Sequence, residues 1–148
     1  MDVSRPPRIG AVISFCYLWR RELEAGLVEG AKARPCLVVA IEPERGEGGA
    51  RPWVTVLPIT HQPPADPAAA LALPADTKVR LDLEEQASWI TLGEANGFLW
   101  PGYDIRPLAG DDTWLDGYVG RGLFTTLRRK LADLLRNPPS IPAVDRGG

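Results

Sequence analysis

The sequence predicts a mainly β domain, a small barrel with one C-terminal helix packed on it, and three observations lead to this fold class. Short runs of β-branched and aromatic residues recur between turns rich in glycine and proline, as in small barrels. Leucine and valine recur at spacings of three and four over residues 119–136, which is typical of an amphipathic helix. The chain has 148 residues, 45% of them hydrophobic, which is enough for a single domain with its own core.

Five segments have the composition or the period-two alternation of β-strands. In chain order they are Ile9–Phe15, Cys36–Ile41, Trp53–Ile59, Lys78–Leu83 and Ser88–Leu92. Pro58 should place the end of the third strand at an edge or a bulge. A short helical turn is expected at Arg20–Ala25 and a Pro/Ala-rich loop at 62–70, whereas residues 98–114 fit no single element.

The two ends of the chain are expected to lie outside the core of the domain. Residues 1–8 are a proline-containing lead-in, and residues 9–137 form the single domain, which includes the helix at 119–136. The sequence Asn137-Pro138-Pro139 should end that helix. Residues 138–148 are then predicted to be a flexible tail.

No segment has the pattern of a membrane or secretion signal. Met1–Pro7 lacks the apolar stretch of a signal peptide, and apolar runs such as Cys36–Ile41 are too short to span a bilayer. The sequence therefore predicts a soluble cytoplasmic protein without membrane contact. Cys16 and Cys36 form no metal-binding pattern with the single histidine, so we expect buried, reduced thiols.

The charge of the chain does not indicate its partner. The net charge is −2, whereas nucleic-acid-binding domains usually carry an excess of lysine and arginine. The distribution is uneven, because residues 1–40 carry six basic and four acidic side chains. Composition alone therefore leaves RNA binding open.

Three pieces of the sequence form an ordered series: Gly10, then Glu29 followed by Arg34-Pro35-Cys36-Leu37-Val38-Val39, then Val54-x-Val56-Leu57-Pro58-Ile59-Thr60. Over residues 9–135 this series resembles the MazF/PemK family, the toxins of type II toxin–antitoxin systems. The resemblance implies an SH3-like barrel, a homodimer and a growth-inhibiting mRNA interferase. Such an enzyme is a metal-independent, sequence-selective endoribonuclease that leaves a 2′,3′-cyclic phosphate and a 5′-hydroxyl.

The same resemblance implies the partners and some of the site residues. The substrate would be single-stranded RNA, the protein partner an antitoxin with a disordered acidic tail, and no metal or cofactor would be needed. Arg34 matches the family's catalytic arginine and Thr60 its catalytic threonine or serine. Glu29 matches an acidic residue at the same distance before Arg-Pro, and Glu94 falls where many members carry an aspartate. Leu92 departs from the pattern, since some members have an arginine there.

The chemistry expected of these residues is that of RNA cleavage without a metal. A base must accept the proton of the 2′-hydroxyl, a cation must stabilise the charged phosphorane, and an acid must protonate the leaving oxygen. The planar guanidinium of Arg34 suits the phosphate, and Pro35 restricts Arg34 to extended conformations that aim it. Glu29 is the preferred base, with Glu94 behind it, and Glu94 is also expected to contact substrate.

Three further side chains are expected to contact the substrate. Lys32 precedes Arg34 on the same loop, and Trp19 could stack on a base. His61 adjoins Thr60, and histidine titrates near neutral pH. Alternation along a strand would turn His61 away from Thr60, so we expect it to contact substrate without serving as the base.

Each of these residues also has an ordinary structural explanation. Arg34 could form a surface ion pair, Thr60 could bond the backbone at a strand end, and the glutamates could be solvated. At the level of function, the alternatives are a catalytically silent SH3-like module that binds protein or nucleic acid, and a gyrase-inhibiting toxin on the same barrel. The combination of Arg34 and Thr60 favours RNA cleavage over both.

Overall fold

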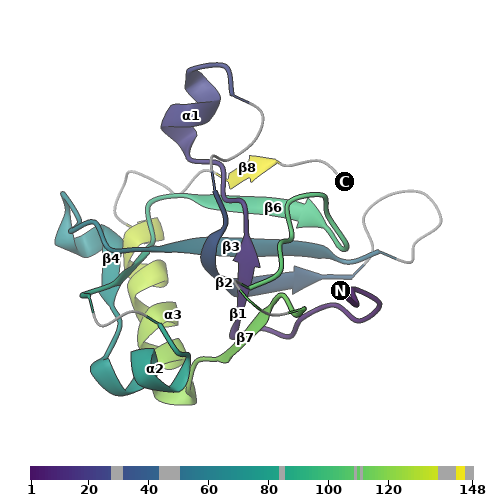
Figure 1. The fold of residues 1–148 in the computed structure, drawn as a ribbon. Helices are drawn as coiled ribbons and strands as arrows, with labels where there is room; N and C mark the ends of the chain where they lie inside the picture. Colours follow the sequence, from purple (N-terminus) through teal and green to yellow (C-terminus); the bar gives the residue numbers. More distant parts are fainter. Residues whose placement is uncertain are drawn as a thin grey trace.

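The structure is a computed structural model that describes residues 1–27, 32–43, 51–83, 86–108, 110, 112–136 and the backbone of 143–145. Within these residues, strands form one mainly antiparallel sheet and three α-helices lie around it (Figure 1). The strands are β1 (Ala11–Phe15), β2 (Arg34–Glu42), β3 (Trp53–Thr60), β4 (Ala70–Ala72), β5 (Trp89–Thr91), β6 (Ala95–Leu99), β7 (Leu115–Tyr118) and β8 (Ala143–Asp145). The helices are α1 (Arg20–Glu24), α2 (Ala75–Arg80) and α3 (Arg121–Arg136), and Pro67–Ala69 form a 3-10 turn.

The sheet is organised around the long strands β2 and β3. Its order is β4-β5-β3-β2-β1-β7, and β6 and β8 extend it from the first half of β3. Strand β3 therefore has two partners on one side, β6 opposite Trp53–Val56 and β5 opposite Ile59 and Thr60. Pro58 lies at the gap between these partners, where a residue without an N–H group is tolerated. The sequence predicted an edge or a bulge at the end of this strand; Pro58 lies inside β3, paired with Cys36 on one side and unpaired on the other.

Both faces of the sheet are buried, because alternate side chains of each central strand enter different cores. One core is largely aromatic and contains Phe15, Phe98, Trp100 and Trp114, with the rings of Phe15 and Phe98 stacked at 4.7 Å. The other core is aliphatic and lies under α3. This arrangement explains why the central strands have continuous apolar runs in the sequence.

Helix α3 confirms the helix predicted over 119–136. Leu127 and Leu134 are buried against the sheet, and Leu123, Phe124 and Leu131 pack beside them at the spacing of one helical face. The Lys130 ammonium donates to the carbonyl oxygens of Pro67 and Ala70, which fixes the helix to the start of β4. Figure 1 shows α1 standing apart from α2 and α3.

One predicted strand is wrong: Lys78–Arg80 form the second half of helix α2, which spans Ala75–Arg80, and Leu81–Leu83 follow it as a turn and an irregular residue. Pro74 is preorganised for the residue before a helix, and Asp76 in the first turn suits the helix dipole. Thr77 and Leu81, four residues apart, are buried on one face, whereas Val79 is 79% exposed. The apolar residues Val79 and Leu81, which suggested a period-two alternation, therefore do not share a buried face.

The prediction of a mainly β fold with a C-terminal helix is confirmed, but a closed barrel is not formed. Among the described residues, β4 and β7 end the sheet without pairing to each other. The other predicted strands are present, with bounds shifted by up to two residues. The segment predicted as a flexible tail contains β8, which runs parallel to β6.

Within the described part of the chain, no helix has the length and apolar composition needed to cross a membrane.

Candidate functional site

The antiparallel pairing of β2 and β3 brings the two principal candidates to one end of the sheet. Cys36 pairs with Pro58, so two residues further along this register Arg34 begins β2 where Thr60 ends β3. Pro35 follows Arg34 directly and keeps its backbone extended. The strand register therefore places a guanidinium beside a hydroxyl.

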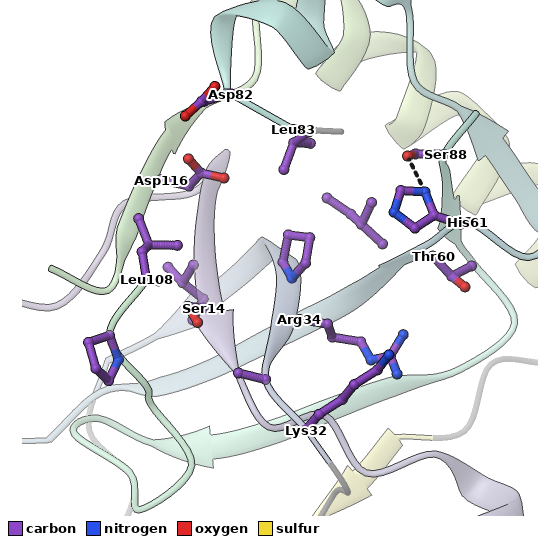
Figure 2. Close-up of a pocket in the computed structure, with 15 residues that line it drawn as sticks. Ser14, Lys32, Arg34, Thr60, His61, Asp82, Leu83, Ser88, Leu108 and Asp116 are labelled. Atoms are coloured by element: carbon purple, nitrogen blue, oxygen red, sulfur yellow. Dashed lines mark hydrogen bonds between the residues drawn. The ribbon is translucent and has the colours of Figure 1, made fainter. Parts of the chain in front are cut away.

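A cavity of about 680 Å³ opens at this end of the sheet. Its volume lies in the range of roughly 300–1,000 Å³ that is usual for sites that bind small ligands. The lining residues are Ile13, Ser14, Lys32, Ala33, Arg34, Pro35, Ile59, Thr60, His61, Asp82, Leu83, Ser88, Pro107, Leu108 and Asp116. Four of the side chains expected at the site, Lys32, Arg34, Thr60 and His61, are thus brought together (Figure 2).

The Arg34 guanidinium is held over an aromatic ring. Its central carbon lies 5.1 Å from the centroid of the Trp19 ring, and the Arg21 guanidinium lies 5.0 Å from the same ring. Such cation–π contacts stabilise a guanidinium without using its N–H donors. Among the described residues, the buried Nε of Arg34 has no hydrogen-bond partner. The contact with Trp19 therefore holds the guanidinium in place without occupying this N–H donor.

Trp19 supports Arg34 and does not offer an open ring to a base. Its side chain is only 8% exposed and belongs to the aromatic core, where it meets Tyr17 edge to face at 5.1 Å. The expectation that Trp19 projects from a loop to stack on RNA is therefore wrong. Its position accounts instead for how Arg34 is aimed.

Strand β6 anchors the segment that carries Trp19. Asn96, which is fully buried, accepts from the Leu18 N–H and donates to the Leu18 carbonyl, both at 2.9 Å. One oxygen of Glu94 accepts from the Tyr17 hydroxyl at 3.1 Å and from the Arg20 N–H at 3.0 Å. Glu94 is not among the residues that line the cavity, so the structure gives it an anchoring role in place of the expected contact with substrate.

Thr60 and His61 both line the cavity. Thr60 Oγ1 accepts from the Gln62 N–H at 3.1 Å, and His61 Nδ1 lies 3.1 Å from Ser88 Oγ (Figure 2). The strand β3 ends at Thr60 and the backbone bends at His61, so the alternation argument does not extend to His61. The imidazole is exposed, and one of its nitrogens is oriented by the buried Ser88.

Two aspartates that the sequence reasoning missed line the opposite side of the cavity. Asp82 has a left-handed backbone with φ of 52°, in the turn after α2. Asp116 lies at a β-bulge, since Val12 pairs with Gly117 but Ile13 pairs with Leu115. Bulges re-aim side chains, and this one turns the carboxyl toward the cavity (Figure 2). Burial, and then the charge of Asp82, raise the pKa of Asp116 to about 6.

The next question is whether the described His, Cys, Asp and Glu residues could hold a metal ion. No group of three or more potential metal ligands occurs within the described part of the chain. Cys16 and Cys36 are free and buried, as expected, and burial raises the pKa of the Cys36 thiol far above its usual range. Glu29, the preferred base, lies outside the described residues.

Comparison of the chain with protein-family models, with curated proteins and with solved structures finds no match. The chemistry of the site is therefore argued from its geometry. A cationic side with Arg34 and Lys32 can bind a phosphate, and a hydroxyl and an imidazole lie beside it. The opposite side offers carboxylates and apolar surface, so the cavity suits a ligand that is anionic at one end only.

Proposed function

We propose that this protein is a toxin-type, metal-independent endoribonuclease that cleaves single-stranded RNA in this cavity, on an open variant of the SH3-like barrel. The observation that supports the proposal is the convergence of Arg34 and Thr60, together with Lys32, on one cavity. Arg34 and Thr60 are also the residues that match catalytic positions in the resemblance to MazF/PemK toxins. A surface ion pair for Arg34, the ordinary alternative, is absent among the described residues.

In this proposal each group has a defined task in an in-line transfer. The 2′-oxygen attacks phosphorus, the bond to the 5′-oxygen breaks, and the products are a 2′,3′-cyclic phosphate and a 5′-hydroxyl. Arg34 stabilises the non-bridging oxygens as negative charge develops on them, and Lys32 adds a second positive charge. Thr60 orients the phosphate through its hydroxyl. The proton of the 2′-hydroxyl passes to a base, and an acid returns a proton to the leaving oxygen.

Fewer candidates for the general base remain than the sequence offered. Glu94 is occupied by Tyr17 and Arg20, and His61 is held by Ser88. We keep Glu29 as the proton acceptor, because it closely precedes Lys32 and Arg34 in the sequence and matches an acidic position in the resemblance. Its carboxylate would need to reach the 2′-hydroxyl within hydrogen-bonding distance.

The proposal includes the partners expected of such a toxin. A disordered acidic tail from an antitoxin would compete with RNA for Lys32 and Arg34, because both ligands are polyanions. A homodimer would present two such cavities. The enzyme would act on cytoplasmic RNA and would need no cofactor.

The test is cleavage of a defined single-stranded RNA by the purified protein in excess EDTA. The expected products carry a 2′,3′-cyclic phosphate and a 5′-hydroxyl, which mass spectrometry identifies directly. Cleavage that stops on chelation, or fragments that end in a 3′-hydroxyl, would overturn the mechanism. Arg34→Ala protein from the same preparation controls for contaminating nucleases.

A cellular measurement separates the ribonuclease from a gyrase-inhibiting toxin. Induction of the protein should arrest growth and fragment transcripts, while plasmid supercoiling stays unchanged. Intact transcripts together with relaxed plasmid would favour the gyrase alternative, and normal growth would favour the silent module.

A further inference from the structure

Half of the cavity has no task in the cleavage reaction. This half, called here the acidic side, is formed by Ser14 on β1, Asp82 and Leu83 after α2, and Leu108 and Asp116 near β7. Figure 2 shows Asp82 and Asp116 on the side of the cavity away from Arg34, Thr60 and His61. A phosphate bound to Arg34 would leave this volume for the rest of the nucleotide.

The polar groups of the acidic side have hydrogen-bonding capacity to spare. Asp116 forms no hydrogen bond or ion pair with another described residue, and only burial and the charge of Asp82 shift its pKa. Ser14 is 5% exposed, and the hydrogen bonds found for it within the described residues involve its backbone only. Half-buried polar groups without partners are costly in a folded protein and indicate a ligand site.

The apolar groups beside them are suited to a flat ring. Leu83, Leu108 and Pro107 line the same cavity as Asp116, and none of them carries a polar side-chain atom. Small-molecule sites commonly combine apolar walls with a few polar groups that fix orientation. A planar heterocycle between these side chains could present its edge to the Asp116 carboxylate.

We propose that the acidic side of the cavity is a nucleobase subsite that selects guanine through the carboxylate of Asp116. The inference rests on the proposed function, since it assigns the base of the same RNA strand whose phosphate meets Arg34. Guanine is the base with two adjacent donors on its Watson–Crick edge, N1–H and the N2 amino group. Two carboxylate oxygens match this pair in the way that bidentate contacts read bases.

The other bases fit the carboxylate less well. Uracil places carbonyl oxygens on both sides of its single N3–H, and these oxygens repel a carboxylate. Adenine and cytosine offer one amino donor next to a ring nitrogen that accepts. A carboxylate has no proton to give to that acceptor, so each of these bases forms one hydrogen bond where guanine forms two.

The charged groups around Asp116 make the selection depend on pH. Asp82 lies on the same side and opposes its ionisation, whereas Lys32, Arg34 and His61 face it across the cavity. The pKa of Asp116 is about 6, so the carboxyl is mostly ionised at pH 7.5 and mostly neutral at pH 5. Guanine selection should therefore weaken as the pH falls through about 6.

The test uses two strands that this chemistry cannot cleave because they lack the 2′-hydroxyl. One is a fluorescent heptamer of deoxyuridine, and the other carries a single central deoxyguanosine. At pH 7.5 the guanine strand should bind roughly tenfold more tightly or better, as measured by fluorescence anisotropy. Asp116→Asn should remove this preference, while Asp76→Asn, an exposed charge outside the cavity, should retain it.

A second variant tests the pH dependence without touching the carboxylate that contacts the base. Asn tolerates the left-handed backbone at position 82, so Asp82→Asn should fold normally. Removing its charge should lower the pH at which guanine preference is lost. An unchanged midpoint, or a preference that survives in Asp116→Asn, would overturn the subsite.

The outcomes also separate the subsite from the proposed function. RNA cleavage without any guanine preference in binding would overturn the subsite alone. Failure to bind either strand, together with failure to cleave RNA, would overturn both. Tight binding of the guanine strand without cleavage would support the subsite and reject the nuclease.

Discussion

The two sides of the cavity differ in how their residues are brought together. The basic side consists of Lys32, Arg34, Thr60 and His61, which lie at the adjoining ends of β2 and β3. The acidic side draws on β1, the turn after α2 and the bulge of β7, three segments that are distant in the sequence. Sequence motifs found the first side and gave no signal of the second.

This difference shows which spatial contacts a sequence motif can predict. An antiparallel pair has one register, so the motif around Arg34 and the motif around Thr60 meet once the two strands pair. No such local rule connects Asp82 with Asp116. The cavity thus joins a side built from two neighbouring strand ends to a side built from segments that are distant in the sequence.

The largest expected effect comes from removing the centre of the basic side. Arg34→Ala should lower the cleavage rate by roughly a hundredfold or more, the usual cost of losing one preorganised donor to developing charge. Arg34→Lys should also be impaired, because an ammonium cannot replace the planar fork. The measurement is single-turnover cleavage of a fluorogenic RNA.

The control for Arg34→Ala is Arg129→Ala, which removes an exposed arginine of α3 that lies outside the cavity. Both variants should melt near the wild-type temperature. A normally folded Arg34→Ala protein with full activity would refute the assignment of the basic side.

His61→Ala should have a smaller effect, a loss of less than tenfold. The imidazole is exposed and its Nδ1 lies beside Ser88 Oγ, so it adjoins the site without being required as the base. Loss of a true general base costs about 10²–10⁴-fold, which separates the two outcomes clearly.

The pH–rate profile assigns any acid limb to one side of the cavity. A limb near pH 6 that persists in His61→Ala and disappears in Asp116→Asn belongs to the acidic side. If His61→Ala loses the acid limb of the profile and cleaves more than tenfold more slowly, the histidine is catalytic. It would then replace Glu29 as the general base.

Asp116→Asn should also stabilise the protein at high pH. Burial raises the pKa of Asp116 to about 6, above the usual value of about 3.9 for an unfolded chain. Below about pH 4 both states hold the proton and the aspartate costs nothing; stability is lost as the pH rises through about 6. At pH 8 the variant should melt about 2–4 °C higher, the shift that roughly 1 kcal/mol gives in a chain of this size after discounting for solvent exposure.

Differential scanning calorimetry at pH 8 and pH 4 measures this difference. The two proteins should melt together at pH 4. Equal melting temperatures at pH 8 would mean that the Asp116 carboxylate is solvated and that its ionisation does not destabilise the fold.

Glu94→Gln should have the smallest effect on catalysis. The glutamine side chain keeps an oxygen that can accept from the Tyr17 hydroxyl and the Arg20 N–H. Glu94 is not among the residues that line the cavity. We expect a cleavage rate within about twofold of wild type and a loss of stability of roughly 1 kcal/mol, because hydrogen bonds to a charged acceptor are stronger than those to a neutral one. A rate decrease of a hundredfold in a folded variant would return Glu94 to the catalytic site.

Much of the fold could be predicted because the signals are local. Helix α3 shows its period over 16 residues, and β2 and β3 are long apolar runs between turns. Helix α2 was missed because six residues are too few to distinguish a helical period from an alternation of two. The direction of His61 stays a prediction, because an alternation holds only as far as the strand does and β3 ends at Thr60.

The sequence by itself determined the mainly β composition and the C-terminal helix, because both show as local periods. Arg34 and Thr60 were expected at one site only through a resemblance, and the register of β2 with β3 brings them to the same end of the sheet. Only the tertiary structure decided that the sheet stays open, that Trp19 lies beneath Arg34 and that Asp116 enters the cavity. The physical reason is that a bulge, a turn and a buried ring contribute no repeating pattern. Their positions follow from the packing of distant segments, which exists only once the chain has folded.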